Sequence, residues 1–244
     1  MRNMVFRNKY GLICSAVLAC FIAVSTFLLK GTGFTGPVSD SSGLLFSVLS
    51  WSAGKEGFLI TTALLCLVPF ALRWSRDRIL VALLCFGFVL GGSLVTKTVL
   101  KKVTQEPRPY SQVLTELGKV DSEAQFYQIT PSQREEVVKS AEGLVSHWRL
   151  QHWQGETNYS FPSGHTIFAA AVAVFWGGLL LAEGYRLSAM LIVGWAGMVA
   201  TSRLWLGMHW PADLFGSVAF ATVICLLVPV FVNVVNRVLH RRKA

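Results

Sequence analysis

Charge is scarce in this sequence. Only 14% of the 244 residues are Asp, Glu, Lys or Arg, and 53% are hydrophobic, whereas about 25% of the residues in an ordinary soluble domain are charged. This composition excludes a water-soluble globular domain and indicates a protein of the lipid bilayer. Acidic residues are scarcer than basic ones, 13 against 22, and they form no cluster suited to magnesium. We therefore expect no metal site and no cofactor.

Cysteines are few and follow no pattern. All five fall within apolar stretches and lack the spacing of metal ligands, so we expect them to be small packing residues. They are Cys14, Cys20, Cys66, Cys85 and Cys225. The stretch around Cys20 faintly resembles a lipoprotein cleavage site, but apolar residues continue to Leu29, so cleavage would leave half a helix. An uncleaved first span is the preferred interpretation, and the cleaved form stays the alternative.

Two glycine patterns resemble known motifs without the context those motifs need. Residues 31–36 match the dinucleotide-binding pattern GxGxxG, but no strand pattern precedes them, so we interpret them as a flexible turn. Gly87 and Gly91 form GxxxG within an apolar stretch, which favours close helix packing inside a bundle over dimerisation.

Apolar stretches of about 20 residues recur six times. Each is long enough to cross a hydrocarbon core of about 30 Å as a helix. They cover about residues 10–30, 57–74, 79–100, 164–183, 187–206 and 214–235. The sequence therefore predicts an all-α, polytopic membrane protein, a bundle of six transmembrane helices that forms a single domain over residues 1–244.

Basic residues divide unevenly between the two sides of such a bundle. An even number of helices puts both termini on one side, which holds 11 of the 22 cations and 2 of the 13 acids. These cations are Arg2, Arg7, Lys9, Arg73, Arg76, Arg78, Arg186, Arg237, Arg241, Arg242 and Lys243. The net charge of +9 lies wholly on that side, which the positive-inside tendency makes cytoplasmic. It indicates attraction to anionic lipid rather than binding of nucleic acid.

Two connections on the other side are long, residues 31–56 and 101–163. The second holds most of the polar sequence, and its residues 132–152 mix charged and apolar side chains in a pattern compatible with an amphipathic helix. We expect one or two short helices there, capping the membrane domain on its outer face.

Three short blocks place charge at the edge of an apolar stretch. They are KKVTQEPRP (residues 101–109), FPSGHT (161–166) and SRLWLGMHWPAD (202–213). Following the predicted helices across the membrane brings all three blocks to the outer face. Charge at a membrane edge is costly, so their convergence predicts one functional site.

The residue types in these blocks suit phosphate chemistry. Lys101, Arg108 and Arg203 can together neutralise a group of multiple negative charge. His165 and His209 can exchange protons or attack phosphorus.

The FPSGHT block predicts an anion site at the start of a helix. Pro162 and Ser163 stand where the fourth span begins, so backbone N–H groups near Gly164 and His165 point outward with the positive end of the helix dipole. Gly164 lets an anion approach the backbone because it has no side chain. A plain Ser cap is the alternative, and it leaves His165 unexplained.

The third block pairs a histidine with a carboxylate. His209 precedes Asp213 by four residues, with Pro211 between them at a turn into the last span. A carboxylate that accepts a hydrogen bond from one imidazole nitrogen leaves the other nitrogen's lone pair free. Such a histidine can attack phosphorus.

Together the blocks resemble the three signatures of the type 2 phosphatidic acid phosphatase family. Lys101 with Arg108-Pro109 matches KxxxxxxRP, residues 162–165 match PSGH, and residues 202–213 match SRxxxxxHxxxD. The flanking stretches HWQGET and LGMHWPADL are similar to a bacterial branch of the family that acts on phosphatidylglycerophosphate. The similarity thins in the first two helices and over residues 112–145.

The resemblance implies a role for each residue. His209 would be the nucleophile that forms a phosphohistidine, Asp213 would orient it, and His165 would protonate the leaving oxygen and then activate water. The phosphoryl oxygens would be held by Lys101, Arg108, Arg203, Ser163 and Gly164. Ser202 is left without a firm role beyond support of Arg203.

The activity implied is a metal-independent lipid phosphatase of the bacterial inner membrane with its active site facing the periplasm. Its partners would be membrane lipids and lipid phosphates such as phosphatidylglycerophosphate, undecaprenyl pyrophosphate and phosphatidate, with no nucleic acid and no obligate protein partner. Two alternatives stay open: a lipid phosphotransferase of the same fold, and an anionic-lipid transporter. The transporter is disfavoured because the charges cluster at one membrane edge and not near the midplane. The sequence neither ranks the substrates nor gives the oligomeric state.

Overall fold

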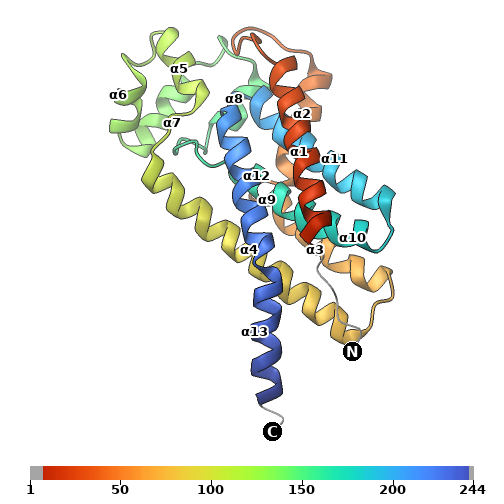
Figure 1. Ribbon diagram of the computed structural model, residues 1–244. Coiled ribbons are helices and arrows are strands. Elements are labelled where there is room, and N and C mark those ends of the chain that lie inside the picture. The colour runs from red at the N-terminus through yellow and green to blue at the C-terminus, as the bar shows by residue number, and fades with distance from the viewer. Residues whose placement is uncertain (1–7, 242–244) are drawn as a thin grey trace.

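The computed structural model describes residues 8–241, which form helices joined by short connections and contain no named strand (Figure 1). The all-α class predicted from the sequence is confirmed. Of the basic residues assigned to the inner side, Arg2, Arg7, Arg242 and Lys243 lie outside the described residues.

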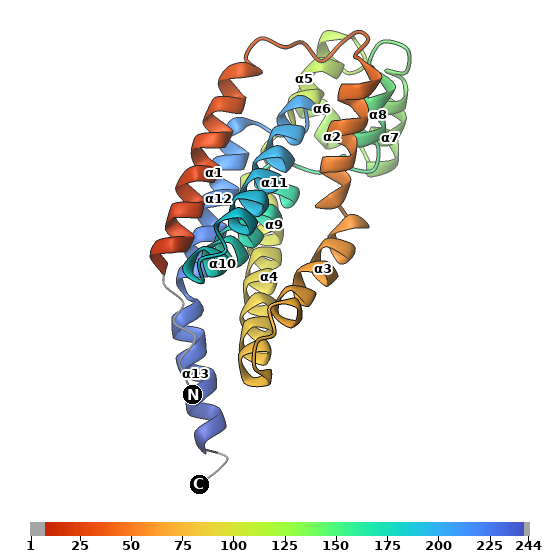
Figure 2. The ribbon, with the colours of Figure 1, turned by 90° about the vertical axis from the view of Figure 1, so that its right-hand side faces the viewer.

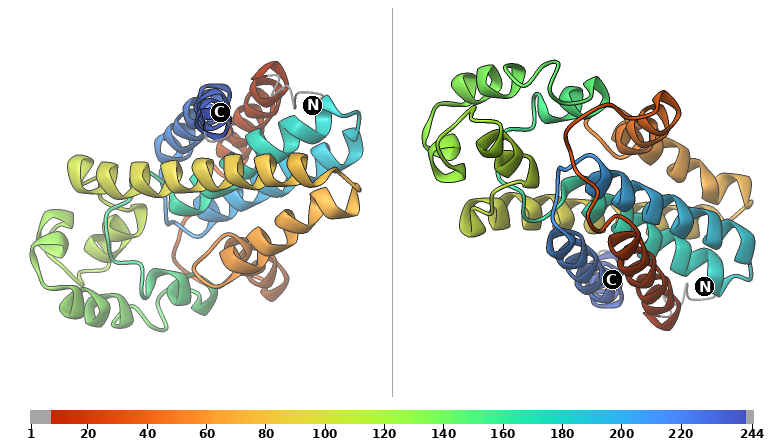
Figure 3. Two further views of the ribbon diagram at one scale, coloured as in Figure 1. Left: turned by 90° about the horizontal axis from the view of Figure 1, so that it is seen from below. Right: turned by 90° about the horizontal axis from the view of Figure 1, so that it is seen from above.

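A bundle of long apolar helices forms the body of the molecule. Its helices are α1 (Asn8–Leu28), α4 (Arg76–Thr104), α9 (Gly164–Val172), α11 (Arg186–Trp205) and α12 (Pro211–Leu226). α9 lies at the centre and packs on α4, α11 and α12. Its run Ala169–Ala171 is fully buried, because small side chains let neighbouring backbones approach closely. Figure 3 shows α4 crossing the whole bundle.

Two further pieces extend these helices. α9 continues through a π-helical turn, η1 (Ala173–Gly177), into α10 (Gly178–Ala182). α12 continues into α13 (Val228–Arg241), which projects beyond the bundle in Figure 1.

Five helical stretches of the described chain are long and apolar enough to cross a membrane. They are Asn8–Leu28, Arg76–Glu116, Gly164–Ala182, Arg186–Trp205 and Pro211–Val234. Each coincides with one of the six predicted spans, namely the first and the third to sixth. The chain is a multi-pass membrane protein.

The second predicted span, residues 57–74, differs from the structure. Helix α3 (Gly57–Ala71) has only 15 residues, and it is bent by 64° from α2 (Asp40–Ser52), a helix that the sequence did not predict. The two count as a sixth span only when taken together. α2 packs on α11, and its Gly43 lies against the Trp148 ring. These tertiary contacts explain a helix in a stretch with several serines.

Four short helices lie between α4 and α9, more than the one or two expected. They are α5 (Pro109–Glu116), α6 (Glu123–Gln128), α7 (Pro131–Lys139) and α8 (His147–Trp153). Tyr110, Phe126 and Trp153 are fully buried in a second core that also contains Trp205 from the end of α11. Figure 2 shows these helices together at one end of the bundle, where they position the loop that leads into α9.

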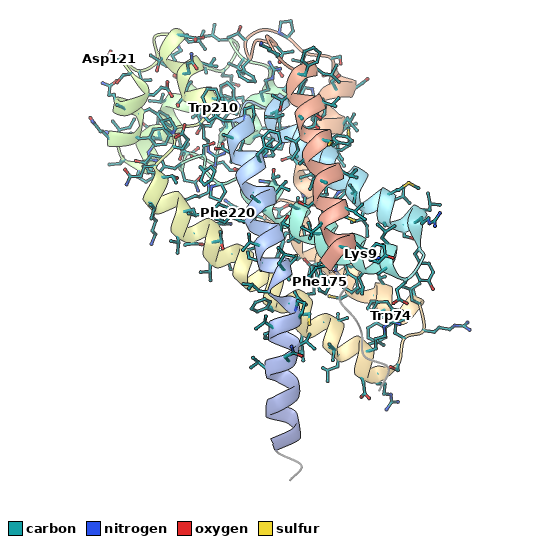
Figure 4. All side chains as sticks on the ribbon, in the orientation of Figure 1. Lys9, Trp74, Asp121, Phe175, Trp210 and Phe220 are labelled. Atoms are coloured by element: carbon teal, nitrogen blue, oxygen red, sulfur yellow. The ribbon has the colours of Figure 1, made fainter. Side chains whose placement is uncertain are left out.

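The opposite end carries basic residues at the starts of helices and in the connections before them. Arg78 forms an ion pair with Glu183 at 2.5 Å and lies 3.9 Å from the centre of the Trp74 ring. These contacts join the α3–α4 connection to the α10–α11 connection. In Figure 4, Lys9 and Trp74 lie toward this end, whereas Trp210 lies near the four short helices.

Two expectations about small residues are wrong. A Cβ atom added at Gly87 or Gly91 would meet nothing within 4 Å, because this face of α4 points away from the bundle, and it is Gly92 that packs closely, against Ile224. Cys20 is exposed on α1, so it is not a packing residue. Residues 31–36 do form an irregular turn, as expected.

Candidate active site

The structure brings the three sequence blocks together at the end of the bundle that carries the short helices. Their residues come from six places: Lys101 from the last turn of α4, Arg108 from the turn before α5, His165 from the first turn of α9, Arg203 from the end of α11, His209 from the loop before α12, and Asp213 from its first turn. Side chains from all three blocks are linked by the contacts below.

His209 sits in a buried hydrogen-bonding network. Its Nδ1 lies 3.2 Å from Asp213 Oδ2 and 3.1 Å from Ser160 Oγ, and the Ser160 hydroxyl donates to the same carboxylate oxygen. Asp213 Oδ2 also accepts from the backbone N–H of Trp210 at 2.9 Å, while the Asp213 N–H donates to the Trp210 carbonyl at 3.0 Å at the start of α12. The start of α12 therefore fixes both the carboxylate and the imidazole.

The partners of His209 define its tautomer. Nδ1 faces a carboxylate and so carries the proton, whereas Nε2 lies 3.3 Å from Arg108 Nη1, a donor, and so holds the lone pair. Burial, followed by the charges of Arg108, Arg203 and Lys101, lowers the pKa of His209 well below its ordinary value. The imidazole is neutral at physiological pH and can act as a nucleophile through Nε2.

Arg108 is buried beside this nitrogen and is held from several sides. Its Nε donates to the Asn158 carbonyl and its Nη2 to Asn158 Oδ1, both at 2.7 Å, while Nη1 donates to the Met208 carbonyl at 3.0 Å. These contacts fix the guanidinium next to His209 Nε2.

Arg203 and Lys101 complete a cationic cradle, defined here as Lys101, Arg108 and Arg203. Arg203 is fully buried and donates to Ser50 Oγ at 2.5 Å and to Glu156 Oε2 at 3.0 Å, while its Nε has no partner among the described residues. Lys101 Nζ donates to the carbonyls of Tyr159 and, at 3.2 Å, Ser160. The cradle can compensate the charge of a phosphoryl group.

The FPSGHT block borders the cradle. Ser163 caps α9 by accepting from Thr166 N–H at 3.3 Å, and its carbonyl accepts from the hydroxyl of Ser217 on α12 at 3.2 Å. The first-turn N–H groups of a helix have no partner within the helix and can bind an anion. His165 Nε2 lies 3.8 Å from Glu156 Oε1, close to the cradle.

Two residues of the site, Glu156 and Ser160, were not predicted from the sequence. Both belong to the polar stretch QGETNYS immediately before the FPSGHT block, and this adjacency is the signal that points to them. Ser202, by contrast, donates to the Val199 carbonyl of its own helix at 2.7 Å, and no contact with Arg203 is seen. Between residues 8 and 241, no group of three His, Cys, Asp or Glu side chains is arranged to hold a metal ion.

Comparisons with known proteins identify the family of this chain. A family model described as the PAP2 superfamily matches residues 82–237, which include all three blocks. Phosphatidylglycerophosphatase B of Escherichia coli strain K12 is 33% identical over 185 residues, covering 67% of this chain and 72% of that protein. The protein of the same name from Haemophilus influenzae is 32% identical over 190 residues, covering 74% of this chain and 78% of the relative.

A solved structure shares the fold. The crystal structure of a transmembrane PAP2 type phosphatidylglycerolphosphate phosphatase from Bacillus subtilis superposes with a TM-score of 0.50 over 96% of this chain and 97% of that one. The sequence identity of the pair is 21%.

Proposed function

The chain belongs to the PAP2 superfamily and is a multi-pass membrane lipid phosphatase, and we propose that it hydrolyses phosphate monoesters or pyrophosphates of lipids through a phosphohistidine at His209. The observation that carries the proposal is the buried His209 imidazole, whose Nδ1 contacts Asp213 and Ser160 and whose Nε2 lies 3.3 Å from Arg108 of the cationic cradle.

In the first step, the cradle and the backbone N–H groups of Ser163 and Gly164 bind the phosphoryl oxygens. His209 Nε2 attacks phosphorus, an N–P bond forms, and the bond from phosphorus to the lipid oxygen breaks. His165 donates the proton that the leaving oxygen needs. Asp213 stabilises the positive charge that develops on His209.

In the second step, His165 accepts a proton from water as the water oxygen attacks phosphorus. The N–P bond breaks, inorganic phosphate leaves, and His209 recovers its lone pair. Both steps require positioned cations around the equatorial oxygens.

The relatives named phosphatidylglycerophosphatase B make phosphatidylglycerophosphate the first substrate to test, followed by undecaprenyl pyrophosphate and phosphatidate. The test is release of inorganic phosphate from each purified lipid in detergent, with a His209→Ala control. Release by the native chain alone supports hydrolysis. Transfer of the phosphoryl group to an added alcohol or lipid acceptor in place of water would assign a phosphotransferase, and transport of lipid without any phosphate release would contradict the proposal.

The first prediction concerns which end of the bundle faces outward. We propose that the four short helices and the site face the periplasm of a bacterial inner membrane, with both termini cytoplasmic. In a cysteine-free background, Lys119→Cys is expected to react with a membrane-impermeant maleimide in intact cells and Arg76→Cys only after permeabilisation. Arg76 lies at the basic end and Lys119 between α5 and α6, so the two report opposite sides. The reverse labelling pattern would put the site in the cytoplasm.

The second prediction is metal independence. Three cations lie where magnesium would otherwise compensate phosphoryl charge, so a chelator is expected to leave the rate of phosphate release nearly unchanged. The measurement is the initial rate with and without a chelator, followed by added magnesium. A loss greater than about tenfold that magnesium restores would contradict the prediction.

A further inference from the structure

Glu156 places a carboxylate inside the cationic cradle. Its Oε2 lies 3.0 Å from Arg203 Nη2 and 3.3 Å from Arg108 Nη2, and its Oε1 lies 3.8 Å from His165 Nε2. One side chain thus contacts three of the groups assigned to phosphate binding and proton transfer.

This carboxylate is ionised at physiological pH. Burial alone would raise the pKa of Glu156, but the charges of Arg203 and Arg108, both in contact with the carboxylate, outweigh it and hold the pKa below the ordinary value of a glutamate. The cradle therefore already contains one resident negative charge.

The backbone around Glu156 is fixed, whereas the side chain is a quarter exposed. The Tyr110 hydroxyl donates to the Glu156 carbonyl at 3.1 Å. On either side, Glu135 accepts from the Gly155 N–H at 2.9 Å and from the Thr157 hydroxyl at 3.0 Å. Rotation of the side chain alone can release the arginines.

A bound phosphoryl group needs the same donors. Arg108 contacts His209 Nε2 through Nη1 and Glu156 through Nη2, so a phosphorus atom in line with Nε2 brings its oxygens to the guanidinium that holds the carboxylate. Two anions on the same pair of arginines repel each other. Binding of a phosphoryl group must therefore displace the Glu156 carboxylate.

We propose that Glu156 is a resident anion that competes with phosphate groups for the cradle, so that a doubly charged group displaces it readily and a singly charged group does not. A phosphate monoester or a terminal pyrophosphate brings two negative charges in exchange for one, and this exchange is electrostatically favourable next to three cations. A phosphodiester brings only one charge and gains nothing by the exchange. Glu156 thus keeps the headgroups of ordinary phosphodiester lipids, which surround the site in any bilayer, out of the cradle. This inference rests on the proposed function, since it assumes that the cradle binds phosphate.

The experiment compares two soluble ligands, inorganic phosphate and dimethyl phosphate, by isothermal titration calorimetry of the purified full chain in detergent at pH 8. Inorganic phosphate is largely a dianion at this pH, and dimethyl phosphate is a monoanion. The native chain is expected to bind inorganic phosphate more tightly. Glu156→Gln is expected to bind each of the two ligands about tenfold more tightly than the native chain does, because a native site that its own anion occupies about nine-tenths of the time loses that factor in apparent affinity for either ligand.

A matched control removes an exposed carboxylate from α5. Glu116→Gln changes the net charge by the same amount outside the cradle and is expected to leave both affinities unchanged. If Glu156→Gln does not elute as a folded protein, Glu156→Ala removes the same charge and replaces it in the titration.

The outcomes separate this inference from the proposed function. If Glu156→Gln or Glu156→Ala binds dimethyl phosphate no more tightly than the native chain does, the resident-anion role is overturned, even in a chain that hydrolyses lipid phosphates. Failure of the native chain to bind inorganic phosphate would overturn it as well. A native chain that binds phosphate but releases none from any lipid contradicts the proposed function, while the titrations still decide the role of Glu156.

Discussion

Replacing His209 with alanine is expected to lower phosphate release by at least about 10³-fold, because it removes the nitrogen lone pair that Asp213 and Ser160 orient toward the cradle. The variant loses the Nε2 atom that faces Arg108 and keeps the carboxylate of Asp213 bound to Trp210 N–H and Ser160. The measurement is the turnover number for a lipid phosphate and for nitrophenyl phosphate.

Loss with both substrates is essential to this prediction, since His209 must form the N–P bond whichever group leaves. Inorganic phosphate binding by the variant, measured by calorimetry, serves as the control that the cradle is intact. Turnover within about tenfold of the native chain would assign the nucleophile elsewhere, first to His165.

Replacing Asp213 with asparagine is expected to lower turnover by roughly 10² to 10⁴, the range for other carboxylates that orient a catalytic histidine. The amide keeps an oxygen that can accept from Trp210 N–H, so the start of α12 should remain folded. It lacks the negative charge that stabilises the imidazolium and fixes the proton on Nδ1. The measurement is kcat, with KM expected to change little because the cradle is untouched.

Ser160→Ala is the matched control for the Asp213 variant. It removes a hydroxyl that contacts both His209 Nδ1 and Asp213 Oδ2 but leaves the charge in place. Loss of a single hydrogen bond of this kind should reduce kcat by about tenfold. If Asp213→Asn loses no more activity than Ser160→Ala, the carboxylate charge has no special role.

The membrane frame could be predicted because length and apolarity alone decide whether a helix spans a bilayer. Five of the six predicted spans coincide with spans in the structure. The α2–α3 pair could not be predicted, because the bend at residues 53–56 and the helix before it depend on contacts with distant elements. Trp148 Nε1, for example, donates to Asp40 Oδ1 at 2.8 Å across 108 residues of sequence.

The residues of the candidate site could be predicted where they lie close together in the sequence and form a recognisable motif. His209 and Asp213 are four residues apart at a helix start, and the structure places them in hydrogen-bonding contact. Ser160 reaches His209 across 49 residues, and Glu156 reaches Arg203 across 47. Which side chains of the QGETNYS stretch turn inward is decided by the short helices that hold the loop. No local pattern carries that information.

The most direct test of a phosphohistidine mechanism is to trap the intermediate and locate it. His165→Ala should slow the attack of water, and nitrophenyl phosphate needs little protonation of its leaving group, so this variant with this substrate should accumulate the phosphoenzyme. After alkaline quenching and proteolysis, mass spectrometry locates the phosphate. We expect an acid-labile phosphate on His209, absent from the His165→Ala, His209→Ala double variant. Phosphate on any other residue, or a nitrophenol burst that leaves no phosphate on the protein, would contradict nucleophilic attack by His209.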